Sequence, residues 1–141
     1  MKKKILGLFV GLVILFCVTG CGSVGTKTIT CVSDKIGSSP AIVYYEIYKV
    51  KNNEITEFEK YSVRTFDEEY LKLVTLDETI EIYEKDKEVK VEKLGDNQLK
   101  VIDTNPVNVF KNSTTDDLET LIINTMEKND FSLYTYTCEV K

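Results

Sequence analysis

The one long apolar stretch of the chain lies at its N-terminus and leaves the rest of the sequence to build the folded part. Met1-Lys2-Lys3-Lys4 is a cationic start, Ile5–Val18 is an apolar run, and small residues follow. This is the order of an export signal. The run has 14 residues, whereas a helix that spans a bilayer needs about 20. We therefore predict a cleaved signal peptide over residues 1–20 and no permanent transmembrane anchor.

The end of this signal has a distinctive pattern, Val18-Thr19-Gly20-Cys21. An ordinary secretory site carries small residues in an A-x-A-like pattern. This run instead resembles the lipobox of bacterial lipoproteins, with Val18 where Leu is more usual. The resemblance implies cleavage between Gly20 and Cys21 and attachment of diacylglycerol to the Cys21 sulfur. The alternative is an ordinary cleaved signal with a chance cysteine.

Lipidation would also fix the location of the protein. One acyl chain holds only marginally, whereas two chains on one glycerol anchor stably. The expected location is the extracytoplasmic face of the cell membrane. The expected partners are membrane lipid, through the acyl anchor on Cys21, and a small ligand or a neighbouring membrane protein.

The processed chain has the size and charge of one acidic domain. Removal of residues 1–20 leaves 121 of the 141 residues, too few for two separate cores. Loss of Lys2, Lys3 and Lys4 leaves 15 basic against 23 acidic residues, a net charge of −8. This charge argues against binding nucleic acid. We predict a short lipidated tether over residues 21–26 and a single domain over residues 27–141.

Cys31 and Cys138 stand near opposite ends of this domain, and a disulfide between them is the simplest prediction for an exported protein. Ile29 and Cys31 share one face of a first strand, and Tyr136 and Cys138 share one face of a last strand. Neighbouring strands would let the two sulfurs meet. The alternative is two buried free thiols. A metal site is disfavoured, because two cysteines without histidine supply half of the ligands that zinc prefers.

β-branched and aromatic segments separated by turn residues predict six strands. Large side chains on both faces of the second strand favour a central strand covered on both sides. The turns Lys51-Asn52-Asn53-Glu54 and Gly95-Asp96-Asn97 predict two hairpins. The predicted strands are Lys27–Ser33, Ala41–Val50, Ile55–Thr65, Glu88–Leu94, Gln98–Asp103 and Phe131–Val140.

Spacings of three and four between apolar residues predict two helices. The first covers Asp67–Lys85, and Thr65 with Glu68 matches a capping box at its start. The second covers Thr115–Lys128, with Ser113 or Thr114 as its cap. The first helix would present Leu73, Leu76, Ile80 and Tyr83 on one stripe. The resulting order is β-β-β-α-β-β-α-β, which predicts an α+β domain with one antiparallel sheet and two helices packed on it.

Taken together, these motifs resemble the small YehR-like lipoproteins of Gram-positive bacteria. The similarity covers the lipobox, a Thr-Ile-Thr-Cys strand soon after it, an aromatic-rich hairpin, an acidic helix and a final strand with Thr-Cys. The resemblance implies no site residues beyond Cys21 and the pair Cys31 and Cys138.

The sequence offers little for catalysis. It contains no histidine, which excludes Ser-His-Asp and Cys-His arrangements. It shows no phosphate-binding loop, and we expect no cofactor and no metal. Two acidic clusters, Asp67-Glu68-Glu69 and Asp116-Asp117, could form an acid/base pair for glycoside chemistry. Both also fall at predicted helix starts, where the helix dipole favours acidic residues.

Two classes of function therefore remain. The first is a non-enzymatic binding or interaction module, whose ligand-binding residues the sequence leaves unknown. Any pocket would lie between helix Asp67–Lys85 and the sheet. Tyrosines could line a groove for sugar or peptide, although tyrosine is also simply a good strand former. The tyrosines concerned are Tyr44, Tyr45, Tyr48, Tyr61, Tyr134 and Tyr136.

The alternative function is a hydrolase at the cell surface that uses carboxylates alone.

Overall fold

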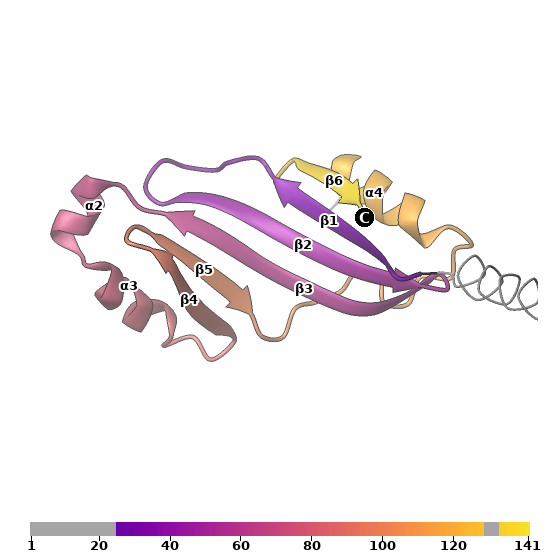
Figure 1. Cartoon of the computed structure of the whole chain (residues 1–141), viewed down its shortest axis with the longest axis horizontal. Coiled ribbons are helices and arrows are strands. Elements are labelled where there is room, and N and C mark those ends of the chain that lie inside the picture. The colour runs from indigo at the N-terminus through magenta and orange to yellow at the C-terminus, as the bar shows by residue number, and fades with distance from the viewer. Residues whose placement is uncertain (1–24, 129–132) are drawn as a thin grey trace, which may run out of the picture.

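A six-stranded antiparallel sheet forms the body of the protein (Figure 1), as the predicted α+β class requires. The computed structural model describes residues 25–128 and 133–141. Across the sheet the strand order is β4-β5-β3-β2-β1-β6. The strands are β1 (Lys27–Ser33), β2 (Ala41–Lys51), β3 (Glu54–Thr65), β4 (Val89–Gly95), β5 (Gln98–Asp103) and β6 (Tyr136–Val140).

The hairpin of β2 and β3 is the longest feature of the sheet, and its turn follows from two asparagines. Asn52 and Asn53 have φ angles of 51° and 60°. A two-residue hairpin turn with positive φ at both positions matches the right-handed twist of the strands, and asparagine tolerates that backbone region. The second predicted hairpin, β4 with β5, is also present, and Val91 pairs with Val101.

The helices of the described residues are α2 (Glu68–Leu73), α3 (Leu76–Tyr83) and α4 (Leu118–Lys128). Helix α4 packs Leu118, Ile122 and Met126 into a core with residues of β1, β2 and β6. Leu76, at the start of α3, joins a smaller core with Phe66 and Leu99. The chain order is therefore β-β-β-α-α-β-β-α-β, which corrects the predicted order and the predicted number of two helices.

Both cores lie on the same face of the sheet. Tyr48 of the larger core pairs with Phe58, and Arg64, six residues after Phe58 on β3, pairs with Leu99 of the smaller core. Since side chains alternate along a strand, Tyr48, Phe58, Arg64 and Leu99 all point to one side. We call this side the covered face and the other side the open face. The helices sit toward opposite ends of the sheet, α3 near β4 and α4 near β1 and β6 (Figure 1).

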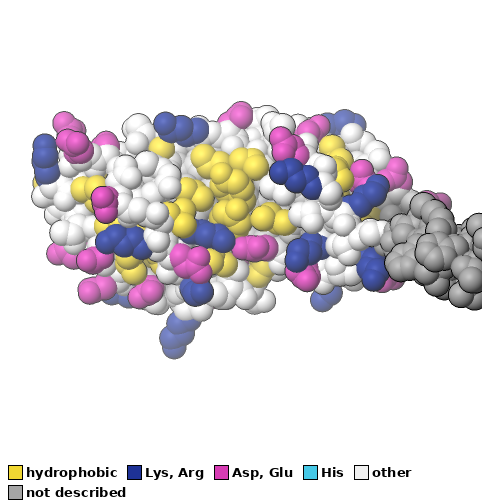
Figure 2. Space-filling view, viewed as in Figure 1, with side chains coloured by type: hydrophobic (Ala, Val, Ile, Leu, Met, Phe, Trp, Pro, Cys, Tyr) yellow, Lys and Arg dark blue, Asp and Glu magenta, His cyan; other side chains and the backbone are white. Residues whose placement is uncertain are grey.

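The open face corrects the expectation that β2 is covered on both sides. Its side chains include Val43, Tyr45 and Ile47 of β2, which are half-buried, and the rings of Tyr45 and Tyr61 stack with centroids 4.8 Å apart. The helices of the described residues pack on the other face. Figure 2 shows apolar side chains gathered over the middle of the molecule, with charged side chains of both signs around them.

The predicted helix Asp67–Lys85 is wrong as one element. Val74 has extended backbone angles, φ −138° and ψ 121°, and ends α2. Thr75 then begins α3 with a complete capping box, in which its hydroxyl accepts from the Glu78 N–H and the Glu78 carboxylate accepts from the Thr75 N–H. Such a box favours a new helix start over continuation. As a result Leu73, predicted to be in the apolar stripe, is 85% exposed.

Both predicted helix starts are also corrected. At α2 the cap is Asp67, whose carboxylate accepts from the Tyr70 N–H at 2.8 Å, and Thr65 belongs to β3. Helix α4 begins at Leu118 and not at Thr115. Neither Ser113 nor Thr114 caps it. Asp117 accepts from the Thr120 N–H at 3.0 Å instead, and the Asn53 side chain accepts from the Leu118 N–H at 2.8 Å.

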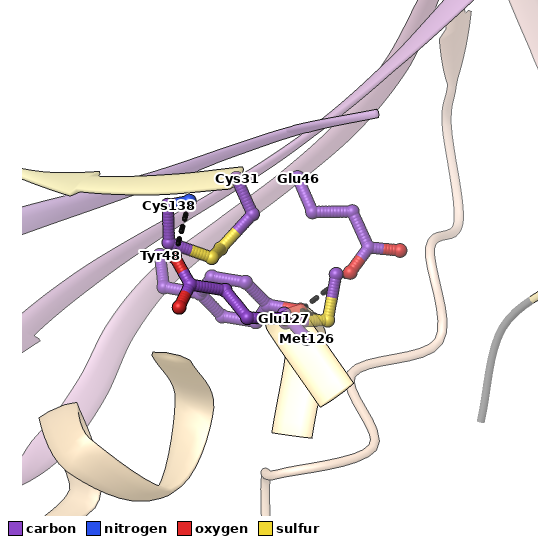
Figure 3. The surroundings of a disulfide bond; sticks show 6 residues. All are labelled: Cys31, Glu46, Tyr48, Met126, Glu127 and Cys138. Atoms are coloured by element: carbon purple, nitrogen blue, oxygen red, sulfur yellow. Dashed lines mark hydrogen bonds between the residues drawn. A yellow bond between two sulfur atoms is a disulfide. The ribbon is translucent and has the colours of Figure 1, made fainter. Parts of the chain in front are cut away.

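The first and last strands are neighbours, as predicted, and Cys31 pairs with Cys138 in the register of β1 and β6. Their sulfurs are 2.10 Å apart, which is a disulfide (Figure 3). Strand β6 is shorter than predicted, since it begins at Tyr136; Phe131 lies outside the described residues. On the outer side of β6, the Cys138 N–H donates to Glu127 of α4 at 3.1 Å. This bond occupies a backbone donor that an edge strand would otherwise leave exposed.

Within residues 25–128 and 133–141, no helix is long and apolar enough to cross a membrane.

Candidate functional site

Two adjoining pockets lie on the covered face, between the part of the sheet under α4 and the turn that follows α3. Their volumes are about 280 Å³ and about 240 Å³. Tyr44 and Lys60 line both, so we treat the two as one depression, the trough. The α4 half is lined by Tyr44, Glu46, Lys60, Val107, Val109, Phe110, Thr125, Met126, Tyr134 and Tyr136. The other half adds Tyr61, Ser62, Arg64, Asp86, Glu88, Val89, Val101 and Asp103.

A buried carboxylate, that of Glu46, lies in the α4 half of the trough. Glu46 alternates with Tyr44 and Tyr48 on the covered face of β2 and pairs with Lys60 of β3. Its Oε2 accepts a 2.5 Å hydrogen bond from the Tyr48 hydroxyl, and its Oε1 lies 3.2 Å from Lys60 Nζ. Figure 3 shows the carboxylate turned toward the Tyr48 hydroxyl beside Met126. A buried charge needs such partners, because desolvation is costly without them.

The two partners of Glu46 differ in their exposure to solvent. Tyr48 is almost completely buried, and its ring packs on Phe58 and Phe110. The Lys60 side chain is 40% exposed, against 12% for that of Glu46. Burial, and next the negative charge of Glu46, raise the pKa of Tyr48. The Tyr48 phenol therefore stays protonated and remains a fixed donor, whereas Lys60 reaches the carboxylate from the solvent side.

Aromatic and apolar side chains form the walls of this half. The rings of Tyr44 and Tyr134 stack with centroids 4.8 Å apart and planes at 16°. Burial, followed by the hydrogen bond with Tyr134, raises the pKa of Tyr44. Val107 and Val109 are 79% and 64% exposed, unusual for valine. An apolar or aromatic body can pack between these valines and the tyrosine rings.

The other half of the trough is more polar. Arg64, the one arginine of the chain, places its guanidinium 4.5 Å from the centre of the Tyr83 ring and donates from Nε to Ser62 Oγ at 3.3 Å. Together the two halves hold two cations and four carboxylates. The cations are Lys60 and Arg64, and the carboxylates are Glu46, Asp86, Glu88 and Asp103.

The two acidic clusters considered for hydrolysis lie elsewhere. Asp67, Glu68 and Glu69 are exposed at the start of α2, and Asp116 and Asp117 are exposed before α4. Backbone and side-chain hydrogen bonds from Thr120 lower the pKa of Asp117. None of the five lines the trough. Asp67 and Asp117 accept the hydrogen bonds of helix caps.

The other site predictions have mixed outcomes. Cys21 lies outside the described residues. Tyr44, Tyr61, Tyr134 and Tyr136 line the trough, and Tyr48 lies beneath it. Tyr45 does not line it, and its ring stacks with that of Tyr61 on the open face. The trough is not between the predicted helix Asp67–Lys85 and the sheet. No residue of α2 or α3 lines it, because their apolar side chains pack against Phe66 and Leu99.

Glu46 and Lys60 were not predicted, although Glu46 gave a signal. It is the one charged residue in the first eight positions of Ala41–Val50, on the face that also carries Tyr44 and Tyr48. A charge at such a position needs a partner or a function. The described residues contain no group of three or more acidic or cysteine side chains placed to hold a metal ion.

No protein-family model, curated protein or solved structure matches the chain. The likeness to YehR-like lipoproteins therefore stays a prediction from sequence, and function must be argued from the trough and from the N-terminal signal.

Proposed function

We propose that the protein is a lipid-anchored, extracytoplasmic binding module that takes a small ligand in the trough. The observation that carries the proposal is the buried Glu46 carboxylate, which lines an open pocket with aromatic and apolar walls. Ligand sites in proteins are commonly apolar depressions with a few fixed polar groups, of roughly 300–1,000 Å³. The α4 half of the trough, of about 280 Å³, lies near the lower limit of this range. It favours a small molecule over a macromolecule.

The anchor would be diacylglycerol on Cys21, as the lipobox-like residues Val18-Thr19-Gly20-Cys21 imply. Residues 21–26 span at most about 20 Å when extended. The domain would therefore stay close to the membrane surface, with the start of β1 nearest to it. A neighbouring membrane protein that delivers or receives the ligand would suit this arrangement. Pull-down from solubilised membranes, with the soluble Cys21→Ser form as control, tests for such a partner.

We propose a binding role rather than catalysis. A hydrolase that uses carboxylates alone needs two carboxyl groups that converge on a substrate. In the two predicted clusters, Asp67 and Asp117 cap helices, and no residue of either cluster lines the trough. Within the trough, Glu46 is engaged by Tyr48 and Lys60. A carboxylate held by partners in this way can orient a ligand.

A screen of small fragments by ¹H–¹⁵N NMR tests the proposal. Bound fragments should shift the backbone signals of trough residues such as Tyr44 and Ser62. Thr125→Trp, which puts a bulky ring into the α4 half, should abolish these shifts. Thr137→Trp, on the open face of β6, is the matched control and should leave them unchanged. A screen in which no fragment perturbs the trough, or in which Thr125→Trp has no effect, would contradict the proposal.

A further inference from the structure

We infer that the trough selects amphipathic cations, small molecules in which an ammonium or amidinium group is joined to an apolar or aromatic body. The inference rests on the proposed function, because it names the ligand class of the same site. Its basis is the pairing of Glu46 with Lys60, together with the charges and aromatic rings around that pair.

The charge balance of the trough favours a cation. Four carboxylates face two cations there, and both cations already have partners. Arg64 lies over the Tyr83 ring and bonds to Ser62, and Lys60 pairs with Glu46. An incoming anion would meet the buried carboxylate of Glu46 at close range. Like charges in a poorly solvated site repel strongly, so an anionic ligand is disfavoured.

Without a ligand, the Lys60 ammonium occupies the position that we assign to the cationic group of the ligand. Its ammonium lies 3.2 Å from Glu46 Oε1 at the end of a flexible four-carbon stem, and the side chain is 40% exposed. A ligand ammonium can take this position while Lys60 turns into solvent. Tyr48 keeps its hydrogen bond to Oε2 throughout, so the carboxylate is never left without a donor.

The walls suit the rest of such a molecule. The stacked rings of Tyr44 and Tyr134 lie in the same half as Glu46. Aromatic faces attract cations, and Phe110, Met126 and the exposed Val107 offer apolar surface for the ligand body. The acidic charge of the processed chain, −8 from 15 basic and 23 acidic residues, also attracts cations over longer distances.

The test uses three probes of one shape: 4-phenylbutylamine, 4-phenylbutanol and 4-phenylbutyrate. Each is titrated at pH 7.5 into the purified full chain in a neutral maltoside detergent, with affinity read from ¹H–¹⁵N NMR shifts of trough residues. We expect the amine to bind about tenfold more tightly than the alcohol, as one charge-assisted hydrogen bond supplies. The carboxylate should bind most weakly.

Two substitutions should change the affinity for the amine in opposite directions. Glu46→Gln keeps an acceptor for Tyr48 and should weaken amine binding about tenfold. Lys60→Gln removes the competing ammonium and should strengthen amine binding severalfold. The matched controls are Glu57→Gln and Lys49→Gln, an ion pair of the same two strands on the open face, and both should leave the affinity unchanged. If Glu46→Gln fails to fold, the direction in which Lys60→Gln changes the affinity for the amine tests the inference by itself.

The outcomes separate this inference from the proposed function. Binding of all three probes with equal affinity, preference for the carboxylate, or weaker amine binding in Lys60→Gln would overturn the ligand class and leave the site itself intact. If no probe shifts the NMR signals of trough residues and the fragment screen also finds no binder, both the inference and the proposed function are contradicted. Amine preference lost in Glu46→Gln and increased in Lys60→Gln is the result we expect.

Discussion

The hydroxyl of Tyr48 donates a 2.5 Å hydrogen bond to Glu46, two residues earlier on the same strand, beneath the trough. Because the donor is buried and the acceptor charged, we expect Tyr48→Phe to lower the free energy of unfolding by about 1.5–3 kcal/mol. Urea denaturation measures this. Tyr45→Phe, on the open face of the same strand, is the control and should change stability by less than about 0.5 kcal/mol. Equal effects of the two substitutions would show that the Tyr48–Glu46 bond contributes no net stability.

The disulfide between Cys31 and Cys138 gives a second prediction. It joins residues 107 positions apart, and closing a loop of this length in the unfolded chain stabilises the native state by about 4–5 kcal/mol in the chain-entropy model. The double variant Cys31→Ala/Cys138→Ala should therefore unfold at a much lower urea concentration. Dithiothreitol should destabilise the wild type similarly and leave the variant unchanged. A wild type indifferent to reductant, or free thiols at both positions by mass spectrometry, would reject the bridge.

The break between α2 and α3 yields a pH-dependent prediction. Hydrogen bonds from the backbone and side chain of Thr75 lower the pKa of Glu78 below its usual value of 4.5. A lowered pKa in the folded state contributes stability above pH 4.5, and this contribution is lost as the pH falls through the lowered value. Thr75→Ala should raise the Glu78 pKa in an NMR titration and destabilise the protein by about 1 kcal/mol at neutral pH.

A control separates this effect from general damage. Thr120→Ala removes the comparable hydroxyl bond to Asp117 at the start of α4 and should leave the Glu78 titration unchanged. At pH 3 the difference in stability between wild type and Thr75→Ala should be smaller than at pH 7. A difference that stays constant between these pH values would exclude the Glu78 carboxylate as its source.

Strands were predictable because their signals are local. The predicted bounds of Lys27–Ser33 and Gln98–Asp103 agree with β1 and β5, and the asparagines of the β2–β3 turn mark the hairpin. The adjacency of the first and last strands followed from Cys31 and Cys138. Turns and alternation thus encoded the two hairpins, and the cysteine pair encoded the neighbouring first and last strands. The pairing of β3 with β5 was not predicted.

The helices show where local patterns mislead. The apolar spacing runs on through Leu73, Val74 and Leu76, so periodicity alone favours one helix, whereas the capping box of Thr75 starts a second one. The start of α4 depends on Asn53, a residue of the β2–β3 turn that is 65 positions before Leu118. Local sequence around Thr115 could not reveal this partner.

The trough was unpredictable for a related reason. Glu46 is visible in the sequence as a lone charge among apolar neighbours, but Phe110 and Met126, which line the same pocket, come from a loop and a helix far along the chain. The separation of the helices toward opposite ends of one face leaves the trough between them. Only the assembled sheet brings Glu46, Lys60 and Tyr134 into one site.

The proposed location of the protein at the membrane surface depends on lipidation of Cys21. Metabolic labelling with a palmitate analogue, in a bacterial host that processes lipoproteins, tests it most directly. We expect label on the wild-type chain and on Cys17→Ala, since Cys17 lies within the predicted signal peptide, and none on Cys21→Ala. Label retained by Cys21→Ala, or absent from the wild type, would contradict the lipid anchor.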